Sequence, residues 1–400
     1  MTHLVHTPTE LPPDRPMAPE DTGPAISPLR PGDDPGKIAV ASQWTLIWRK
    51  FLSNRVAVFA GIVVLAFYLI AMLAEFLAPT SPSLARPQFT YAPPQSIGFF
   101  VPDPDGGRSW QPHVKGYTMS VDPASLRRTF TIDDTAIIPI GFFVEGPAYR
   151  MWGLLDANMR LMGPLDASQP MNLLGTDALG RDLLSRLIYG TRISMSIGLI
   201  GVLSSLVIGV VLGALSGYFG GWTDLVIQRI IEVISAMPTI PLWLGLAAAV
   251  PVAWSPVTVY FMVTLIVSLL AWTGLAREVR GRFLALRHED FVTAAILDGS
   301  SRARVIFRHI LPSLTSHILA VVTLAIPTMI VAETALSFLG VGLKAPVVSW
   351  GVLLQDAQNI RAVSTAPWLL IWPSGAVVLA VLAFNFLGDG MRDAADPYET

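Results

Sequence analysis

The stretch EDFVTAAILDGSSRARVIFRHILPSL, Glu289–Leu314, lies between two long apolar segments and decides the fold of this chain. It contains a short helix-forming run, Thr293–Leu297, with two consecutive alanines. Gly299 follows the run, and glycine can adopt the left-handed conformation that ends a helix. Ser300 or Ser301 can then cap a second helix. The sequence therefore predicts a short, rigid helix that projects between two membrane spans.

The composition is that of a membrane protein. Of the 400 residues, 52% are hydrophobic and only 14% are charged, and the mean hydropathy is +0.55. The chain has no cysteine, which excludes disulfides and thiolate metal sites. The six histidines show no ligand spacing, so no metal site is predicted.

Six stretches have the length of transmembrane helices, for which about 20 apolar residues are needed. They are residues 56–74, 193–215, 225–250, 256–276, 310–332 and 367–388. These stretches are too long and too continuous for the alternating strands of a membrane barrel. Pro238 and Pro241 interrupt the third stretch, where they either line a pathway or form a tolerated kink.

Basic residues in the short loops predict the orientation. With the N-terminus inside, the inner segments hold twelve Lys or Arg residues and the outer loops hold two, Lys344 and Arg361. Both termini are therefore expected in the cytoplasm. The long segment between the first two spans is expected outside, where its alternation over 128–133 and the run 137–144 predict short strands.

These features divide the chain into segments along its length. We predict a disordered cytoplasmic tail (1–43), an amphipathic interfacial helix in contact with membrane lipid (44–55), a first transmembrane helix (56–78), a periplasmic insertion with its connection to the second span (79–192), a five-helix core (193–390) with a cytoplasmic loop (277–312), and a cytoplasmic C-terminus (391–400).

Neither an enzyme nor an ion-coupled transporter is favoured by the residues. The fragment Gly32–Lys37 is glycine-containing, but it lacks the glycine spacing of a phosphate-binding loop and is followed by Ile38 in place of Ser or Thr. Charges within the spans are scarce, and Glu232 and Glu333 are placed near span ends. An ion-coupled transporter needs buried titratable relays, and no converging catalytic set is visible. We therefore predict no catalytic residue and no cofactor.

Several motifs resemble one transporter family. Glu289–Leu314 resembles the coupling loop, or EAA loop, of the membrane subunits of binding-protein-dependent ABC importers, although Thr293 stands where the family usually has Glu and His309 where it often has Ile. Three further segments resemble the C-type permeases of dipeptide and oligopeptide importers. They are LLGTDALGRDLLSRLIYGTR (173–192), ETALSFLGVG (333–342) with Ser349–Gly351, and NFLGDGMRDAADP (385–397).

The resemblance covers residues 44–80 and 170–398 and implies a fold and a function. The implied fold is an all-α membrane protein with six transmembrane helices of the type I ABC importer permease fold, carrying a small, β-rich periplasmic insertion. The implied partners are a homologous permease subunit in a heterodimer, two cytoplasmic ABC ATPase subunits that bind the ATP, and a periplasmic binding protein in a bacterial inner membrane; no nucleic acid is implied. The implied cargo is di- or oligopeptides, with nickel, opines or oligosaccharides as alternatives.

The resemblance also assigns roles to residues. The expected ATPase-coupling residues, with the two alanines fitting a groove on the ATPase, are Asp290, Phe291, Thr293, Ala294, Ala295, Asp298, Gly299 and Arg302. A second set is expected to form a hydrogen-bonded turn that caps the second span, or alternatively to contact substrate: Gly175, Thr176, Asp177, Gly180, Arg181 and Asp182. Glu333 is expected to stabilise a helix end, with substrate contact as the alternative. The Gly209, Gly213 and Gly217 spacing predicts close helix packing, or else a hinge.

Overall fold

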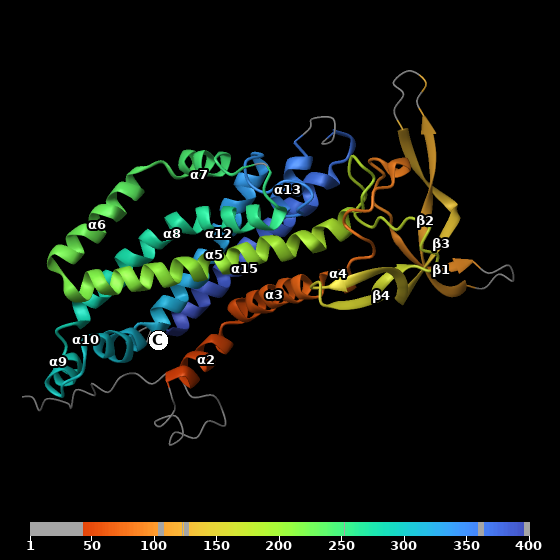
Figure 1. Ribbon diagram of the computed structural model, residues 1–400. Coiled ribbons are helices and arrows are strands. Elements are labelled where there is room, and N and C mark those ends of the chain that lie inside the picture. The colour runs from red at the N-terminus through yellow and green to blue at the C-terminus, as the bar shows by residue number, and fades with distance from the viewer. Residues whose placement is uncertain are drawn as a thin grey trace, which may run out of the picture.

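The computed structural model describes residues 43–102, 108–121, 123, 128–251, 253–358 and 364–395. Residues 1–42 of the predicted tail (1–43) and the last five residues lie outside this range, and Gln43 is the first residue of α2. Long helices form one elongated part of the molecule, and a β-sheet forms the other, at one end of the helices (Figure 1). The expected fold class, a helical membrane protein with a small β-rich insertion, is confirmed.

Five helices in the described part of the chain are long and apolar enough to cross a membrane. They are α3 (Arg55–Met72), α5 (Leu183–Phe219), α8 (Pro256–Leu286), α12 (Thr315–Phe338) and α15 (Trp368–Ala395). Their shared core includes Met195, Val267, Ile330 and Phe384. Before α3 lies α2 (Gln43–Ser53), the expected interfacial helix, and the Asn54 side chain caps α3.

The third span is broken near the prolines that were expected to interrupt it. Residues 221–248 form two helices, α6 (Gly221–Ala236) and α7 (Thr239–Ala248), bent by 87° at their junction. Pro238 lies at the junction, and proline has no N–H to donate and disfavours the helical conformation in the residue before it. A sixth span exists only if this bent pair is counted as one.

Two other helix boundaries differ from the prediction. The second span begins at Leu183 and not at Ile193, so residues 183–192 belong to the helical core and not to the insertion. The fifth helix continues to Phe338 and therefore includes Glu333. In both places the helix contains a charged residue that the hydropathy pattern treats as an end, and that the fold buries with partners.

Glycines allow α5 to approach α8 closely. A Cβ added at Gly213 would lie 2.5 Å from the carbonyl oxygen of Ala276, and one added at Gly217 would lie 2.7 Å from that of Arg280. At Gly209 it would lie 3.0 Å from the side chain of Leu275. These distances confirm the packing interpretation of the glycine spacing.

The insertion is an antiparallel sheet of four strands in sequential order: β1 (Ile97–Pro102), β2 (Arg108–Val121), β3 (Arg128–Met151) and β4 (Leu155–Pro164). The two predicted strands are parts of the single long strand β3. Its first half pairs with β2, and its second half, from Ile140, pairs with β4. The sheet is thus a ribbon that changes partner halfway, with Val114, Ile138 and Met171 buried at the change.

The remaining short helices lie at the two ends of the core. α4 (Ala74–Leu77) and α13 (Trp350–Asp356) lie on the side of the sheet. α9 (Asp290–Leu297), α10 (Arg302–Arg304), a π-helical turn (Val305–Ile310) and α11 (Leu311–Ser313) form the opposite end.

Candidate functional site

The loop between α8 and α12 contains the short helix that the sequence predicts. α9 ends at Asp298, and Gly299 has φ +77°. The Ser300 N–H donates to the Ala295 carbonyl at 3.0 Å, and the Gly299 N–H donates to the Ile296 carbonyl at 3.0 Å. This pair of bonds is the Schellman motif, which requires the left-handed residue at this position. The Ser301 side chain then caps α10.

One face of α9 packs inside the protein. Val292 and Ala295 are buried in a cluster that contains Phe283 of α8 and Val305 of the π-helical turn. Ala295 is therefore part of the internal packing, which differs from the expectation that both alanines face outward. Ala294 is exposed. One face of the helix therefore packs against the core.

The exposed surface of α9 carries large apolar side chains. Phe291 and Ile296 are exposed, and Leu297 is 82% exposed. Phe307 of the π-helical turn adds a fourth exposed apolar side chain. Four other predicted coupling residues are exposed beside them: Asp290, Thr293, Asp298 and Arg302. Large exposed apolar side chains interspersed with polar residues are typical of a protein–protein contact site.

Polar contacts connect this loop to the neighbouring helices. The Arg302 guanidinium lies 5.8 Å from the centroid of the Phe219 ring at the end of α5. The Arg280 guanidinium donates two hydrogen bonds, of 2.5 and 2.6 Å, to the Asp224 carboxylate at the start of α6. Arg287 donates to the Gly217 carbonyl at 3.3 Å. These contacts connect α10 and the end of α8 to α5 and α6.

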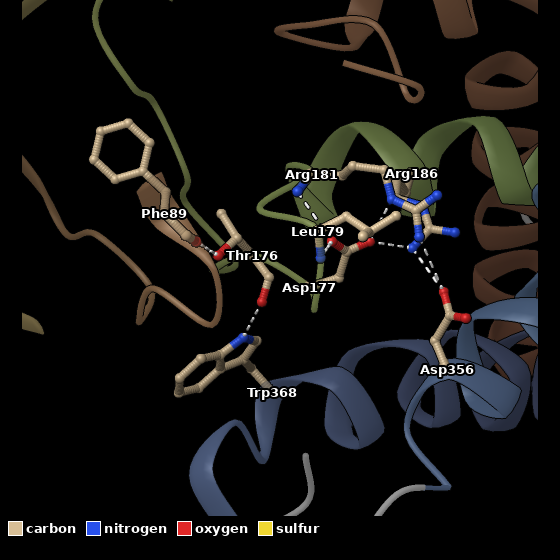
Figure 2. A network of polar contacts seen from close by, with 8 residues as sticks. All are labelled: Phe89, Thr176, Asp177, Leu179, Arg181, Arg186, Asp356 and Trp368. Atoms are coloured by element: carbon tan, nitrogen blue, oxygen red, sulfur yellow. Dashed lines mark hydrogen bonds and ion pairs between the residues drawn. The ribbon is translucent and has the colours of Figure 1, made fainter. Parts of the chain in front are cut away.

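At the other end of the core, Asp177 and Arg181 of the second predicted set belong to an ion-pair network (Figure 2). The Asp177 carboxylate accepts hydrogen bonds from the backbone N–H groups of Leu179 and Arg181, at 2.8 and 3.0 Å. It also accepts from Arg181 Nε at 2.7 Å and from Arg186 Nη1 at 2.5 Å. Arg186 Nη1 also lies 2.8 Å from the carboxylate of Asp356, the last residue of α13. The turn therefore connects the start of α5 to α13.

The neighbouring residues of this turn hold two further segments. Trp368 Nε1, at the start of α15, donates to the Thr176 carbonyl at 3.1 Å, and the Thr176 hydroxyl donates to the Phe89 carbonyl at 2.5 Å (Figure 2). Gly175 and Gly180 have φ of +81° and +70°. A Cβ at Gly180 would lie 1.9 Å from the carbonyl oxygen of Arg86. Because Thr176, Asp177 and Asp182 are buried, the geometry favours a structural cap over substrate contact.

Asp182 is the N-cap of α5. One carboxylate oxygen accepts from the Ser185 N–H at 2.8 Å, and the other, Oδ1, is buried without a hydrogen-bond partner among the described residues. Burial raises the pKa of the Asp182 carboxyl from 3.8 to about 6. The folded protein therefore binds the carboxyl proton of Asp182 more tightly than the unfolded chain does.

We expect Asp182→Asn to stabilise the protein at neutral pH but not at pH 4. The contribution of Asp182 to stability is fully present below pH 4 and is lost as the pH rises through 6, whereas Asn stays neutral and can still accept from Ser185. The stabilisation by Asp182→Asn is at most about 3 kcal/mol at pH 7. The unfolding midpoints of the purified wild type and variant, measured from pH 4 to 8, should diverge up to about pH 6 and then stay parallel. A difference that does not change with pH would contradict this account.

The predicted fifth span ended just before Glu333, but in the structure Glu333 lies within α12 and is wholly buried. Its carboxylate accepts hydrogen bonds from the hydroxyls of Ser337 and Ser349, both at 2.8 Å, and from Ser194 at 3.3 Å. It therefore connects α12 to α5 and to the start of α13. Glu232 was expected near the start of the third span, but it lies near the C-terminal end of α6, close to the bend between α6 and α7. It pairs with Arg229 at 2.6 Å on an exposed surface.

Several functional contacts were missed at the level of sequence. Arg186 lies within the quoted motif, and its charge inside an apolar helix was a usable signal. Its partner Asp356 is 170 residues away, and no local pattern connects the two. The described residues contain no group of three His, Asp or Glu residues placed to hold a metal ion.

Two protein families match this chain. Residues 209–398 match the family described as binding-protein-dependent transport system inner membrane component. Residues 42–94 match the N-terminal TM domain of oligopeptide transport permease C. The first match includes α8, α9 and α12, and the second includes α2 and α3.

Similar proteins are found among characterised sequences. The oligopeptide transport system permease protein OppC of Haemophilus influenzae is 38% identical over 260 residues, which are 64% of this chain and 80% of that protein. The glutathione transport system permease protein GsiD of Pectobacterium atrosepticum is 32% identical over 90% of this chain and 92% of its own. A solved inward-facing structure of the MetNI methionine ABC transporter, 16% identical, covers 52% of this chain and 96% of its own with a TM-score of 0.42.

Proposed function

The chain belongs to the family of binding-protein-dependent transport system inner membrane components, and on this premise we propose that it forms one half of the pathway of a peptide importer. Peptides are the proposed cargo because relatives are named as oligopeptide, dipeptide and glutathione permeases. The protein crosses the inner membrane several times. It catalyses no reaction itself and binds no cofactor.

The exposed apolar face of α9 carries the proposal. A soluble ATPase can move buried helices only through a rigid contact, and the buried side of α9 belongs to one cluster with residues of α8, α12 and the π-helical turn. We assign the face to a cytoplasmic ABC ATPase subunit, one of two in the complex. ATP binds to these subunits, and their closure moves α9 and with it the core helices.

The side of the molecule formed by α6 and α7 is the proposed contact with a homologous permease subunit. This side is opposite to α3 (Figure 1). It exposes the Arg229–Glu232 pair together with Val233 and Ile240. A charged pair at this position would be costly against lipid tails, which supports protein or a water-filled pathway as its neighbour. A periplasmic binding protein delivers the cargo to the end of the core that carries the sheet.

The experiment that tests the function is peptide uptake. A strain that lacks this subunit should lose uptake of labelled di- and tripeptides, and the plasmid-borne gene should restore it. The complex isolated through a tag on this chain should contain a second permease and ATPase subunits. Normal peptide uptake by the deletion strain would contradict the assignment of the cargo, and isolation without an ATPase would contradict the assignment of the machinery.

The purified subunit alone is expected to hydrolyse no ATP, because the sequence has no phosphate-binding loop. The measurement is the steady-state rate of phosphate release by the chain in detergent, compared with the assembled complex as a positive control. A rate that co-elutes with the isolated chain in successive purification steps would contradict the prediction.

The sheet is expected outside the cell membrane and α9 inside, as the basic loops predict. The chain has no cysteine, so single cysteines report their own positions. Ser109→Cys, exposed on β2, should react with a membrane-impermeant maleimide in intact spheroplasts. Leu297→Cys should react only after lysis. The reverse pattern would invert the topology.

A further inference from the structure

The hairpin that joins β3 to β4 ends in an apolar tip. Its residues are Met151, Trp152, Gly153, Leu154 and Leu155. Leu154 is 84% exposed and Leu155 is 67% exposed. Directly behind the tip, Arg150 and Asp156 form an exposed ion pair with a distance of 2.8 Å. The hairpin therefore ends in exposed leucines, and the charged Arg150–Asp156 pair flanks them on the two strands.

The tip is fixed to the end of the first span. Trp152 Nε1 donates to the carbonyl of Met72, the last residue of α3, at 3.0 Å. The Arg192 guanidinium lies 4.3 Å from the centroid of the Trp152 ring and pairs with the Glu75 carboxylate. Trp152 and Gly153 have φ of +54° and +72°. A non-glycine residue rarely keeps a positive φ unless its surroundings hold it there.

These contacts set the depth of the tip along the membrane normal. Figure 1 shows the hairpin running back from the sheet to the end of α3. α3 has 18 residues, an apolar length of about 27 Å, which is close to the thickness of the hydrocarbon core. The end of α3, and the tip bonded to it, therefore lie at the outer boundary of that core.

The side of the molecule that carries the tip has the character of a lipid-facing surface. After Arg55, its first residue, the exposed side chains of α3 are uncharged, and include Phe59, Ile62, Leu65, Leu69 and Met72. At the other end of α3, Trp48 of the interfacial helix α2 is also exposed. Tryptophans are enriched at both boundaries of a membrane. The charged exposed surface of α6 lies on the opposite side.

We propose that the β3–β4 hairpin tip inserts into the outer boundary of the lipid bilayer and anchors the external sheet to the membrane surface. Trp152 takes the position of an interfacial tryptophan, and Leu154 and Leu155 enter the region of the acyl chains. The Arg150–Asp156 pair stays among the lipid headgroups. The anchor fixes the sheet relative to the outer end of the pathway, and it goes beyond the proposed transport function.

The test is the depth of a probe at the tip. An environment-sensitive fluorophore is attached to Leu154→Cys, in a chain without other cysteines, within the importer complex in lipid vesicles. Shallow nitroxide-labelled lipids should quench it at least twofold more than they quench the control, and aqueous iodide at least twofold less. The matched control is Leu165→Cys, a leucine that is 66% exposed at the other end of β4.

Two results would overturn the proposal. Iodide quenching equal to that of the control would place the tip in water, and protection from both quenchers would mean that another protein subunit covers it. Leu155→Cys repeats the measurement at the adjacent residue, in case one label disturbs the turn. The readout does not depend on uptake, so failure here leaves the proposed transport function untouched.

Discussion

Leu297→Asp is expected to reduce peptide uptake to less than a tenth of the wild-type rate while the subunit remains in the membrane. Leu297 is 82% exposed at the end of α9, so the change removes no internal packing. Burying a leucine at an interface contributes about 1.5–3 kcal/mol, and burying an unpaired carboxylate in its place costs more. Each 1.4 kcal/mol corresponds to about tenfold in an equilibrium constant, which makes the loss of ATPase contact nearly complete.

The matched control for this variant is Leu165→Asp, at an exposed leucine directly after β4. Uptake and membrane abundance are measured for both variants in the deletion strain. The control should retain most of its uptake. Normal uptake with Leu297→Asp would mean that the exposed face of α9 does not couple ATP hydrolysis to transport.

Gly213→Val is expected to reduce the amount of subunit in the membrane at least tenfold. The added Cβ would lie 2.5 Å from the carbonyl oxygen of Ala276, a backbone atom that cannot move without separating α8 from α5. Overpacking in a core costs about 1–3 kcal/mol of stability and occasionally more. We expect the cost of Gly213→Val at the upper end of this range, because the added group meets backbone atoms. The measurement is the amount of folded subunit extracted from membranes, quantified by fluorescence-detected size exclusion.

The same substitution at Gly274 is the control. Gly274 lies on α8, near Ala276, and no described atom is within 4 Å of the position of an added Cβ. Gly274→Val should accumulate normally. If Gly213→Val also accumulates normally but transports nothing, the hinge interpretation of the glycine spacing would replace the packing interpretation.

The existence of the spans could be predicted from the sequence, because apolar length alone decides it. Their ends could not, because a hydropathy pattern treats Arg186 or Glu333 as the end of a helix. The fold hides these charges with Asp177 and Asp356, and with three serine hydroxyls. An interruption at Pro238 could be predicted from the proline itself, but the angle of 87° could not.

Some features of the candidate site could likewise be predicted from the sequence, and others could not. The end of α9 at Gly299 was predictable, since the left-handed residue follows from local backbone chemistry. Which alanine faces outward was not, because that depends on how α9 packs on Phe283 and Val305. The contact of Trp152 with Met72 joins residues 80 positions apart, and only the folded chain brings them together.

The most direct test of the central claim is a crosslink from α9. A photoreactive probe on Leu297→Cys, in a chain without other cysteines, is activated in inside-out membrane vesicles that contain the whole complex. The account predicts an adduct with the cytoplasmic ATPase subunit whose yield changes when ATP is added, and no such adduct from Ser109→Cys. An adduct of Leu297→Cys with the periplasmic binding protein, or no adduct with the ATPase, would contradict the claim that α9 couples ATP hydrolysis to transport.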